Sequence, residues 1–407
     1  MRRHLAVHAV LPAAAAALAM AFWPARPAGQ VVDRRVAVLP EPTGTAVALA
    51  VLVNAGTAWE TDREAGLSHL AARAVVEEVA ARLDALGAVA AAHCDAAAMG
   101  FTLLAPPATW RAAANLFLDA LFRTSPTDDA IARARAALVQ ALAREEGSPA
   151  ADARLALREA HYGRYSRWAR PPCGRAAEVA ALDAADVRRM LRTRFVPARA
   201  AAALAGPVTA KEGLDLLGDV FGDVSLPVLL PRPHPAPGAG RRALVQPTVT
   251  TWIGWAFPLP ADPDARALEL LAFRIEQAVG PAPARPEIYD LGIEIERHGA
   301  GGALLISLVT APDRAGVWAE RVEDLIRRTA SDRMPEAQLQ EATRRYLGRR
   351  LLDLATPEAR ALDAARQLFF DHGHLPPDDA VRDLTPERLR RAAASLGRPA
   401  RATLAPD

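Results

Sequence analysis

The spacing of apolar and polar positions changes repeatedly along the chain, and each change marks an expected element. Short apolar runs rich in β-branched residues predict strands, whereas longer alanine-rich stretches predict helices. In the first half the expected strands are residues 36–40, 46–54, 89–93 and 100–105, and the expected helices are residues 66–86, 109–122 and 126–146. This order is typical of an α+β layer and differs from the regular alternation of a parallel α/β fold.

A proline-rich segment separates this half from a second one with the same order of elements. Residues 226–243 carry five prolines and two glycines, which predicts a linker without regular structure. Beyond it the pattern predicts strands over residues 248–257, 291–296 and 303–308, and helices over residues 262–279 and from residue 315 onward. Residues 182–205 and 384–404 repeat one another, since each holds a capped helix, a proline turn and a closing strand.

We therefore predict two tandem homologous domains, residues 31–225 and 244–407. A chain of 407 residues exceeds what one hydrophobic core usually holds, which agrees with a division into two. In each domain we expect an α+β fold, with a mixed, mostly antiparallel β-sheet and helices packed on it.

The N-terminal segment differs from the rest of the chain. Basic residues precede an apolar, alanine-rich run over residues 5–22, and Ala19-Met20-Ala21 offers a small-x-small cleavage site. Residues 1–30 are therefore expected to be a signal peptide and lead-in. An uncleaved membrane anchor is the alternative, because the run approaches the length that spans a bilayer. Both interpretations place the protein outside the cytoplasm, in the periplasm or secreted.

Charge and cysteine content narrow the function classes. The 49 Lys and Arg residues nearly balance the 47 Asp and Glu residues, and the two signs are mixed along the chain. Nucleic acid is therefore not an expected partner. Outside the cytoplasm, Cys94 and Cys173 would lie in an oxidising compartment, where a disulfide can form. The sequence leaves open whether these two cysteines pair. Neither has the spacing of a zinc knuckle.

A motif at the start of the first long helix carries a family resemblance. The strand that ends in Ala55-Gly56 is followed by Gly66-Leu67-Ser68-His69-Leu70. Together with the duplicated α+β pattern, this resembles the pitrilysin/insulinase-like zinc peptidases of the two-domain, processing-peptidase type. The resemblance implies a LuxS/metallohydrolase-like fold in each domain. In that family the helix carries Gly-Leu-x-His-x-x-Glu-His, because histidines at i and i+4 share one helix face and the Glu polarises a zinc-bound water.

Only the first histidine of that motif survives in this chain. The resemblance places Ala72 at the general base, Arg73 at the second metal ligand and Ala141 at the third, which leaves His69 alone. A guanidinium about 4 Å from a dication is disfavoured by roughly 8 kcal/mol at an effective dielectric near ~20. We therefore expect no zinc and no other cofactor, with Arg73 paired to Glu77 one turn along the helix. We interpret His69 as a relic of the lost zinc motif. The alternative is that His69 still acts as a metal ligand.

The resemblance also implies a substrate-binding pair in the second half. In the family an Arg and a Tyr seven residues apart bind the peptide, and in two-chain members they come from the partner without zinc. Tyr289 matches the Tyr, but the position seven before it is Ala282 and the nearby arginine is Arg285. Arg285 and Tyr289 are therefore the possible substrate contacts. The alternative is that Tyr289 merely begins an edge strand.

The expected function follows from the broken motif and the retained fold. We expect a catalytically inactive subunit that pairs with a zinc-containing homologue to bind and help process unfolded peptides outside the cytoplasm, with a homodimer left open. The chain is not expected to be an enzyme on its own. A structural or adaptor protein of an envelope assembly, using the fold without proteolysis, is one alternative. A zinc metallopeptidase with an unusual ligand set is a second.

Overall fold

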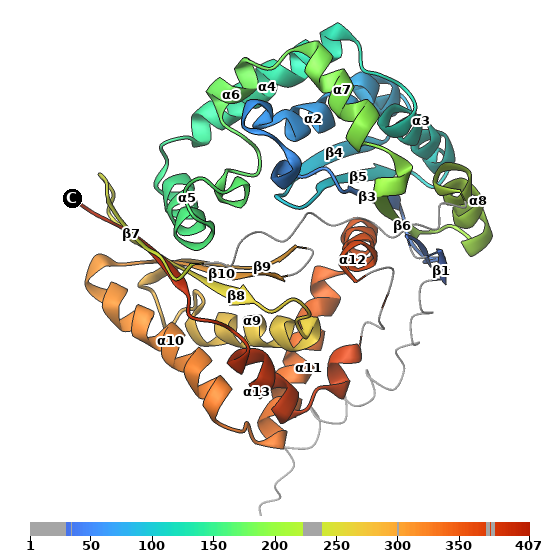
Figure 1. Ribbon diagram of the computed structural model, residues 1–407. Helices are drawn as coiled ribbons and strands as arrows, with labels where there is room; N and C mark the ends of the chain where they lie inside the picture. The colour runs from blue at the N-terminus through green and yellow to red at the C-terminus, as the bar shows by residue number, and fades with distance from the viewer. Residues whose placement is uncertain (1–29, 34, 223–237, 299–300, 372–374, 376–378) are drawn as a thin grey trace, which may run out of the picture.

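The computed structural model contains two β-sheets whose strands follow the same order (Figure 1). It describes residues 30–33, 35–222, 238–298, 301–371, 375 and 379–407. The expected signal peptide and most of the expected linker lie outside these residues. Within them, every helix is too short or too polar to cross a bilayer.

The first sheet has the strand order β1-β2-β6-β3-β5-β4. Only β2 and β6 run parallel, and all other neighbours are antiparallel. The strands are β1 (Gln30–Asp33), β2 (Val36–Pro40), β3 (Val47–Val53), β4 (Val89–Cys94), β5 (Met99–Ala105) and β6 (Ala200–Gly206). One face of this sheet is covered by helices of the same half, whose bounds are α2 (Leu67–Asp84), α3 (Trp110–Phe122), α4 (Asp128–Glu145), α6 (Ala176–Ala180), α7 (Ala184–Arg194) and α8 (Ala210–Phe221).

The second sheet has the order β7-β11-β8-β10-β9 and again a single parallel pair, β7 with β11. Its strands are β7 (Arg241–Val245), β8 (Thr251–Leu259), β9 (Ile288–His298), β10 (Gly301–Thr310) and β11 (Ala400–Ala405). The helices on its outer face are α9 (Ala265–Val279), α10 (Ala315–Ser331), α11 (Glu336–Asp353) and α13 (Pro386–Ala394). Apart from β1, each strand of the first sheet thus has a counterpart at the same place in the second.

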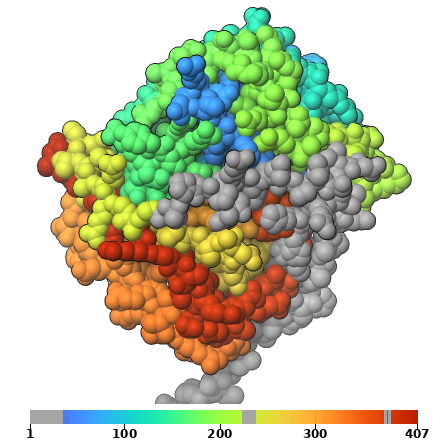
Figure 2. Space-filling view, viewed as in Figure 1, coloured from blue at the N-terminus to red at the C-terminus, as the bar shows by residue number. Residues whose placement is uncertain are grey.

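Two helices lie between the sheets, and each covers the sheet of the other half. Helix α5 (Pro149–Tyr162) packs on β7, β8 and β11, whereas α12 (Pro357–Phe370) packs on β2, β3 and β6 (Figure 1). Figure 2 shows green residues of the first half in contact with yellow residues of the second on the surface. The two halves are therefore held together through exchanged elements.

Alternating side-chain size explains how one sheet accepts helices on both faces. In β3 the larger residues Val47, Leu49, Val51 and Val53 face the helices of their own half, while Ala48, Ala50 and Leu52 face α12. Successive residues of a strand point to opposite faces, so α12 meets small side chains over most of β3, with Leu52 near the end of the strand. Helix α12 can therefore approach the first sheet closely.

The expected α+β fold with mixed, mostly antiparallel sheets is confirmed. The long helix expected over residues 66–86 is α2, and the strands expected over residues 89–93 and 100–105 form the antiparallel pair of β4 and β5. One expectation needs correction, because the predicted linker over residues 226–243 extends into a strand. Strand β7 begins at Arg241, where parallel pairing with Arg401 of β11 orders the chain after the last proline.

Candidate functional site

The helix that carries the degenerate motif is held at its start by a buried glutamate. Glu60 is fully buried, and its two carboxylate oxygens accept the backbone N–H groups of Gly66 (2.9 Å) and Ser68 (2.6 Å). Burial raises the pKa of Glu60 to about 7, although these two hydrogen bonds act in the opposite direction. Glu60 therefore supplies the cap that α2 lacks from its own N-cap residue, Gly66.

Two glycines let a second segment pass close to this helix start. Gly66 and Gly174 have φ values of 81° and 80°, a region that favours glycine. A Cβ on Gly174 would lie 2.6 Å from the Cα of Gly66, so a larger residue there would displace the backbone. This approach brings Cys173 beside His69, which the spacing along the sequence does not reveal.

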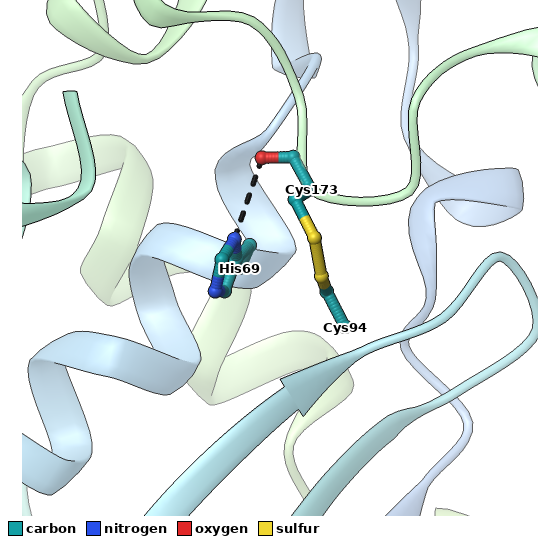
Figure 3. A group of neighbouring side chains, drawn as sticks. All are labelled: His69, Cys94 and Cys173. Atoms are coloured by element: carbon teal, nitrogen blue, oxygen red, sulfur yellow. Dashed lines mark hydrogen bonds between the residues drawn. A yellow bond between two sulfur atoms is a disulfide. The ribbon is translucent and has the colours of Figure 1, made fainter. Parts of the chain in front are cut away.

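Cys94 and Cys173 form a disulfide beside His69 (Figure 3). Their Cα atoms are 5.5 Å apart, within the range that a disulfide bridges, and 79 positions separate them in the sequence. The bond links the end of β4 to the segment before α6. The pairing that the sequence left open is thus settled in the structure.

His69 lies against this disulfide in a partly buried position. Its Nδ1 is 3.4 Å from the carbonyl oxygen of Cys173, which holds the ring in place. Burial lowers the pKa of His69 to about 4, opposed by this contact and assisted by the positive charge of Arg73. The imidazole is therefore neutral at neutral pH.

The other positions of the family's metal site offer no donors. Ala72 is fully buried in the core beside α2, and Ala141 is exposed on α4. The second-ligand position is a partly exposed arginine, Arg73. A catalytic zinc needs about three protein ligands with nitrogen, oxygen or sulfur donors, and this set supplies only the imidazole of His69. The residues at these positions do not fit the zinc that the family's motif binds.

The expected ion pair between Arg73 and Glu77 is wrong. Glu77 Oε2 lies 3.8 Å from Nε of Arg133 on α4 instead. The physical reason is the packing of α2 against α4, which turns Glu77 toward the neighbouring helix rather than along its own.

Arg285 and Tyr289 are not brought together as a substrate-binding pair. The guanidinium of Arg285 donates hydrogen bonds to the carbonyl oxygens of Gly280 (2.8 Å), Ala278 (3.2 Å) and Gln277 (3.3 Å), so it caps the C-terminus of α9. That is the usual place for a cation at a helix end. Tyr289 lies on β9 with 54 % of its surface exposed. Of the two residues, only Tyr289 presents a free side chain to solvent.

A buried polar cluster, which the sequence did not indicate, joins the two halves. Arg158 of α5 pairs with Glu296 of β9 and donates two further hydrogen bonds to the carbonyl oxygen of Trp168 (2.7 and 3.1 Å). The hydroxyl of Tyr162 donates to Glu296 (2.5 Å) and lies 2.8 Å from Nε2 of His298. The ring of His298 stacks on Trp168 with centroids 3.8 Å apart. These contacts fix α5 on the second sheet.

The ionisation of this cluster is set by burial and by its single arginine. Burial opposes the charge on Glu296, yet attraction to Arg158 outweighs it and lowers the pKa of that carboxyl. Burial raises the pKa of neighbouring Glu294 to about 7, and repulsion from Glu296 and Asp95 adds to the shift. Burial and the charge of Glu296 also raise the pKa of Asp95.

These carboxyls line a cleft of about 690 Å³. The walls come from α9, α11, α12, β9 and the turn after β4. Apolar residues of the wall include Phe273, Leu291, Ile293 and Phe370, and charged residues of both signs surround them. Buried carboxyls and apolar side chains thus share the wall of this cleft.

The sequence contains few signals that Glu60, Glu294 and Glu296 belong to a site. Glu60 follows the expected strand but belongs to no motif, and Glu294 and Glu296 read as ordinary outward positions of a strand. One signal was present, since a glutamate alternating with isoleucine in Ile293-Glu294-Ile295-Glu296 indicates a strand with one polar face. That Glu296 of this face is buried against α5 is a tertiary fact.

Residues 181–346 match the family model described as the peptidase M16 inactive domain. This match and the solved structures below support the expected resemblance to a degenerate pitrilysin, or M16, peptidase. No curated protein matches the chain.

Solved structures share the fold of this chain over nearly its whole length. The peptidase M16 inactive domain from Pseudomonas fluorescens has a TM-score of 0.77 and 16% identity, covering 93% of this chain and 98% of that one. A protease from Helicobacter pylori gives 0.75 and 14%, with 95% and 100% covered. A chain of complex III2 from Candida albicans, solved with Inz-5 bound, gives 0.72 and 14%, with 91% and 93% covered.

Proposed function

We propose that this chain is a non-catalytic subunit that binds extended peptides and pairs with a zinc-bearing homologue outside the cytoplasm. The observation that carries the proposal is a long edge strand, β9, beside a cleft in a fold whose zinc donors are missing. The fold that holds a peptide is kept, while the general base and two of the three zinc ligands are absent at residues 72, 73 and 141.

Strand β9 has the features of a peptide-binding edge. It spans 11 residues at the end of the second sheet, so its outer N–H and C=O groups have no partner strand in that sheet. Such an edge can accept an extended peptide as an added strand. Tyr289 stands near the start of β9, and Leu291 and Ile293 follow along the cleft wall. An aromatic and two aliphatic side chains would then contact the peptide's own side chains.

The first sheet ends in a similar edge next to the degenerate helix. Strand β4 is the last strand of that sheet, and Val89 at its start is 64 % exposed. Because β4 also packs against α2, a peptide on this edge would pass the place where an active enzyme holds its metal. We assign the metal and general base to the homologue, since this chain provides only one donor there.

The test combines the disulfide-bonded full chain with a homologue from the same genome that carries an intact His-x-x-Glu-His motif. Hydrolysis of an unstructured fluorogenic peptide is measured for each chain and for the mixture. We expect no turnover from this chain alone and a faster reaction from the mixture than from the homologue. Chelator-sensitive hydrolysis by the oxidised chain alone, lost in His69→Ala, would refute the proposal.

Tyr289→Ala in the mixture separates peptide binding from mere assembly. We expect KM to rise about tenfold, in line with roughly 1–2 kcal/mol for a contact residue, while the stability of the chain stays within ~0.5 kcal/mol. Tyr165→Ala is the matched control, because Tyr165 is 94 % exposed and does not line the cleft. Its KM should not change.

A second candidate, a structural subunit of an envelope assembly, is favoured by the fold shared with a chain of complex III2. It predicts that the chain binds its partner but that peptide turnover in the mixture is the same with Tyr289→Ala and with Arg285→Ala. Arg285→Ala is expected to weaken α9 capping instead, which a thermal melt detects.

A further inference from the structure

His69 and the two cysteines form a compact group of possible metal donors. A ring nitrogen of His69 and the Sγ atoms of Cys94 and Cys173 all lie within 4.8 Å of one another (Figure 3). They come from three separate segments, namely α2, the end of β4 and the loop before α6. In the oxidised protein the two sulfur atoms are bonded to each other and cannot both act as ligands.

Reduction changes the chemistry of this group. Two thiolates and one neutral imidazole make a Cys2His donor set, which binds zinc tetrahedrally and leaves the fourth position open. Typical zinc bonds of about 2.3 Å to sulfur and about 2.0 Å to nitrogen place the ligand atoms roughly 3.5–4 Å apart. A group spread over 4.8 Å reaches that arrangement by side-chain rotation and small backbone shifts.

The backbone around the group limits where these side chains can go. The carbonyl of Cys173 holds the ring of His69, and the close contact of Gly66 with Gly174 keeps the cysteine segment against the start of α2. Glu60 fixes the same helix end from the other side through Gly66 and Ser68. Because these contacts do not involve the disulfide, they remain when it is opened.

The charge of this donor set also differs from that of the family's zinc ligands. Arg73 lies one turn along α2, and its positive charge acts on His69. Two thiolates cancel the charge of a divalent cation, so Arg73 faces a neutral group and its repulsion largely disappears. A cation is also favourable for ionised thiols. Arg73 thus disfavours zinc bound by the family's ligand set, but it does not disfavour zinc bound by the two cysteines and His69.

We propose that His69, Cys94 and Cys173 bind one thiophilic divalent cation of the zinc class when the disulfide between the two cysteines is reduced. A dithiol reductant supplies two electrons and two protons, so the Cys94–Cys173 bond becomes two thiols while the reductant forms its own disulfide. Binding of the cation then releases the two thiol protons to solvent. The disulfide and the metal are alternative occupants of one place.

This inference stands apart from the proposed function. The oxidised chain remains the non-catalytic subunit without metal, and the peptide assays above use that form. Failure to bind metal after reduction would leave those assays unaffected, and failure of pairing would leave the metal site unaffected.

The test uses the full chain, reduced with a dithiol, freed from reductant under anaerobic conditions and titrated with Co²⁺. We expect one equivalent to bind with a thiolate-to-cobalt charge-transfer band, and Zn²⁺ to displace it. The oxidised chain should give no band. Zn²⁺ should also raise the melting temperature of the reduced chain and slow its reoxidation, because bound thiolates are withheld from disulfide formation.

Variants assign the ligands. His69→Ala should weaken Co²⁺ binding by at least about 100-fold, the upper end of what even outer contacts of a metal site contribute. His93→Ala is the matched control, since His93 neighbours Cys94 but is exposed and contacts Thr102 (3.3 Å). The double variant Cys94→Ser, Cys173→Ser should lose the band while near-ultraviolet circular dichroism shows whether it is folded.

Three results would overturn the inference. One is a folded, reduced chain without the charge-transfer band. Another is a band that persists at equal affinity in both His69→Ala and the more conservative His69→Gln. The third is a reduced chain that unfolds and is not refolded by Zn²⁺.

Discussion

The two exchanged helices occupy corresponding places but use different chemistry. Helix α12 lies on the first sheet through Ala361, Ala364 and Ala365, which meet alanines of β3 and β6. Helix α5 also meets alanines on the second sheet, yet it adds the buried pair of Arg158 and Glu296. The α12 contact is apolar along its centre and has one ion pair near the start of the helix, Arg360 with Glu41, whereas the α5 contact contains a larger charged network.

The difference shows what each contact can do. Small apolar side chains let a helix approach closely, and their contribution depends on shape and hardly on pH. A buried charged network contributes little net stability, but it is costly to break once one partner is removed. It also requires one particular alignment of α5 on the second sheet. We infer that the α12 contact mainly supplies packing and the α5 contact mainly supplies alignment.

The largest effect is expected from Arg158→Ala, which breaks the charged contact. Glu296 would stay buried without its cation, and the free energy of unfolding should fall by about 3–5 kcal/mol. Urea unfolding followed by fluorescence measures the loss. Arg344→Ala serves as control, because its pair with Glu341 is exposed and should be worth less than ~1 kcal/mol. Equal losses in the two variants would remove the distinction between the contacts.

A smaller effect is expected from Ala365→Leu, which breaks the apolar contact. Ala365 is fully buried between α12 and the first sheet, so added volume should cost about 1–3 kcal/mol through overpacking. Ala136→Leu, on the exposed side of α4, should change the free energy of unfolding by less than ~0.5 kcal/mol. If Ala365→Leu is as stable as the parent chain, the α12 contact is looser than we describe.

The smallest effect is expected in the pH dependence of the α5 contact. The pKa of Glu294 is raised on folding from 4.5 to about 7, so the folded chain binds more protons than the unfolded chain between these values. Its contribution to stability is therefore present at low pH and is lost as pH rises toward about 7. Glu60, with its pKa also near 7, adds the same trend.

Glu294→Gln isolates this contribution. Melting temperatures measured from below to above the raised pKa should decline less steeply in the variant than in the parent chain, because the glutamine does not titrate. The remaining slope is assigned to Glu60 and Asp95. Parallel curves for the two proteins would show that Glu294 titrates normally and that the α5 contact is as insensitive to pH as the α12 contact.

Much of the fold was predictable because its elements depend on residues that lie close together in the sequence. The strands β3, β5 and β8 are runs of apolar residues, and helix α4, expected over residues 126–146, opens with Thr127 as its cap. The ends of the elements were less certain. Strand β7 was missed as part of the linker, since its formation depends on pairing with β11, more than 150 positions away.

Of the candidate site, the sequence predicted only which metal-binding residues are missing. The residues at positions 72, 73 and 141 follow from a motif with fixed spacing, so their lack of donors is visible in the sequence alone. The role of Arg285 was not visible, because capping of α9 depends on the path of the loop between that helix and β9. A contact that depends on the path of a loop has no periodic signal.

By itself the sequence determined the family resemblance, the repeated order of elements and the broken metal motif, because each is carried by neighbouring residues or regular spacing. Only the tertiary structure decided that α5 and α12 exchange sheets, that Arg158 meets Glu296 and that Cys94 joins Cys173 beside His69. These pairs come together through packing of distant segments, and apolar surfaces of similar composition do not specify in sequence which partner they will bury. The single histidine left from the motif therefore acquires its neighbours, and its inferred chemistry, from the fold.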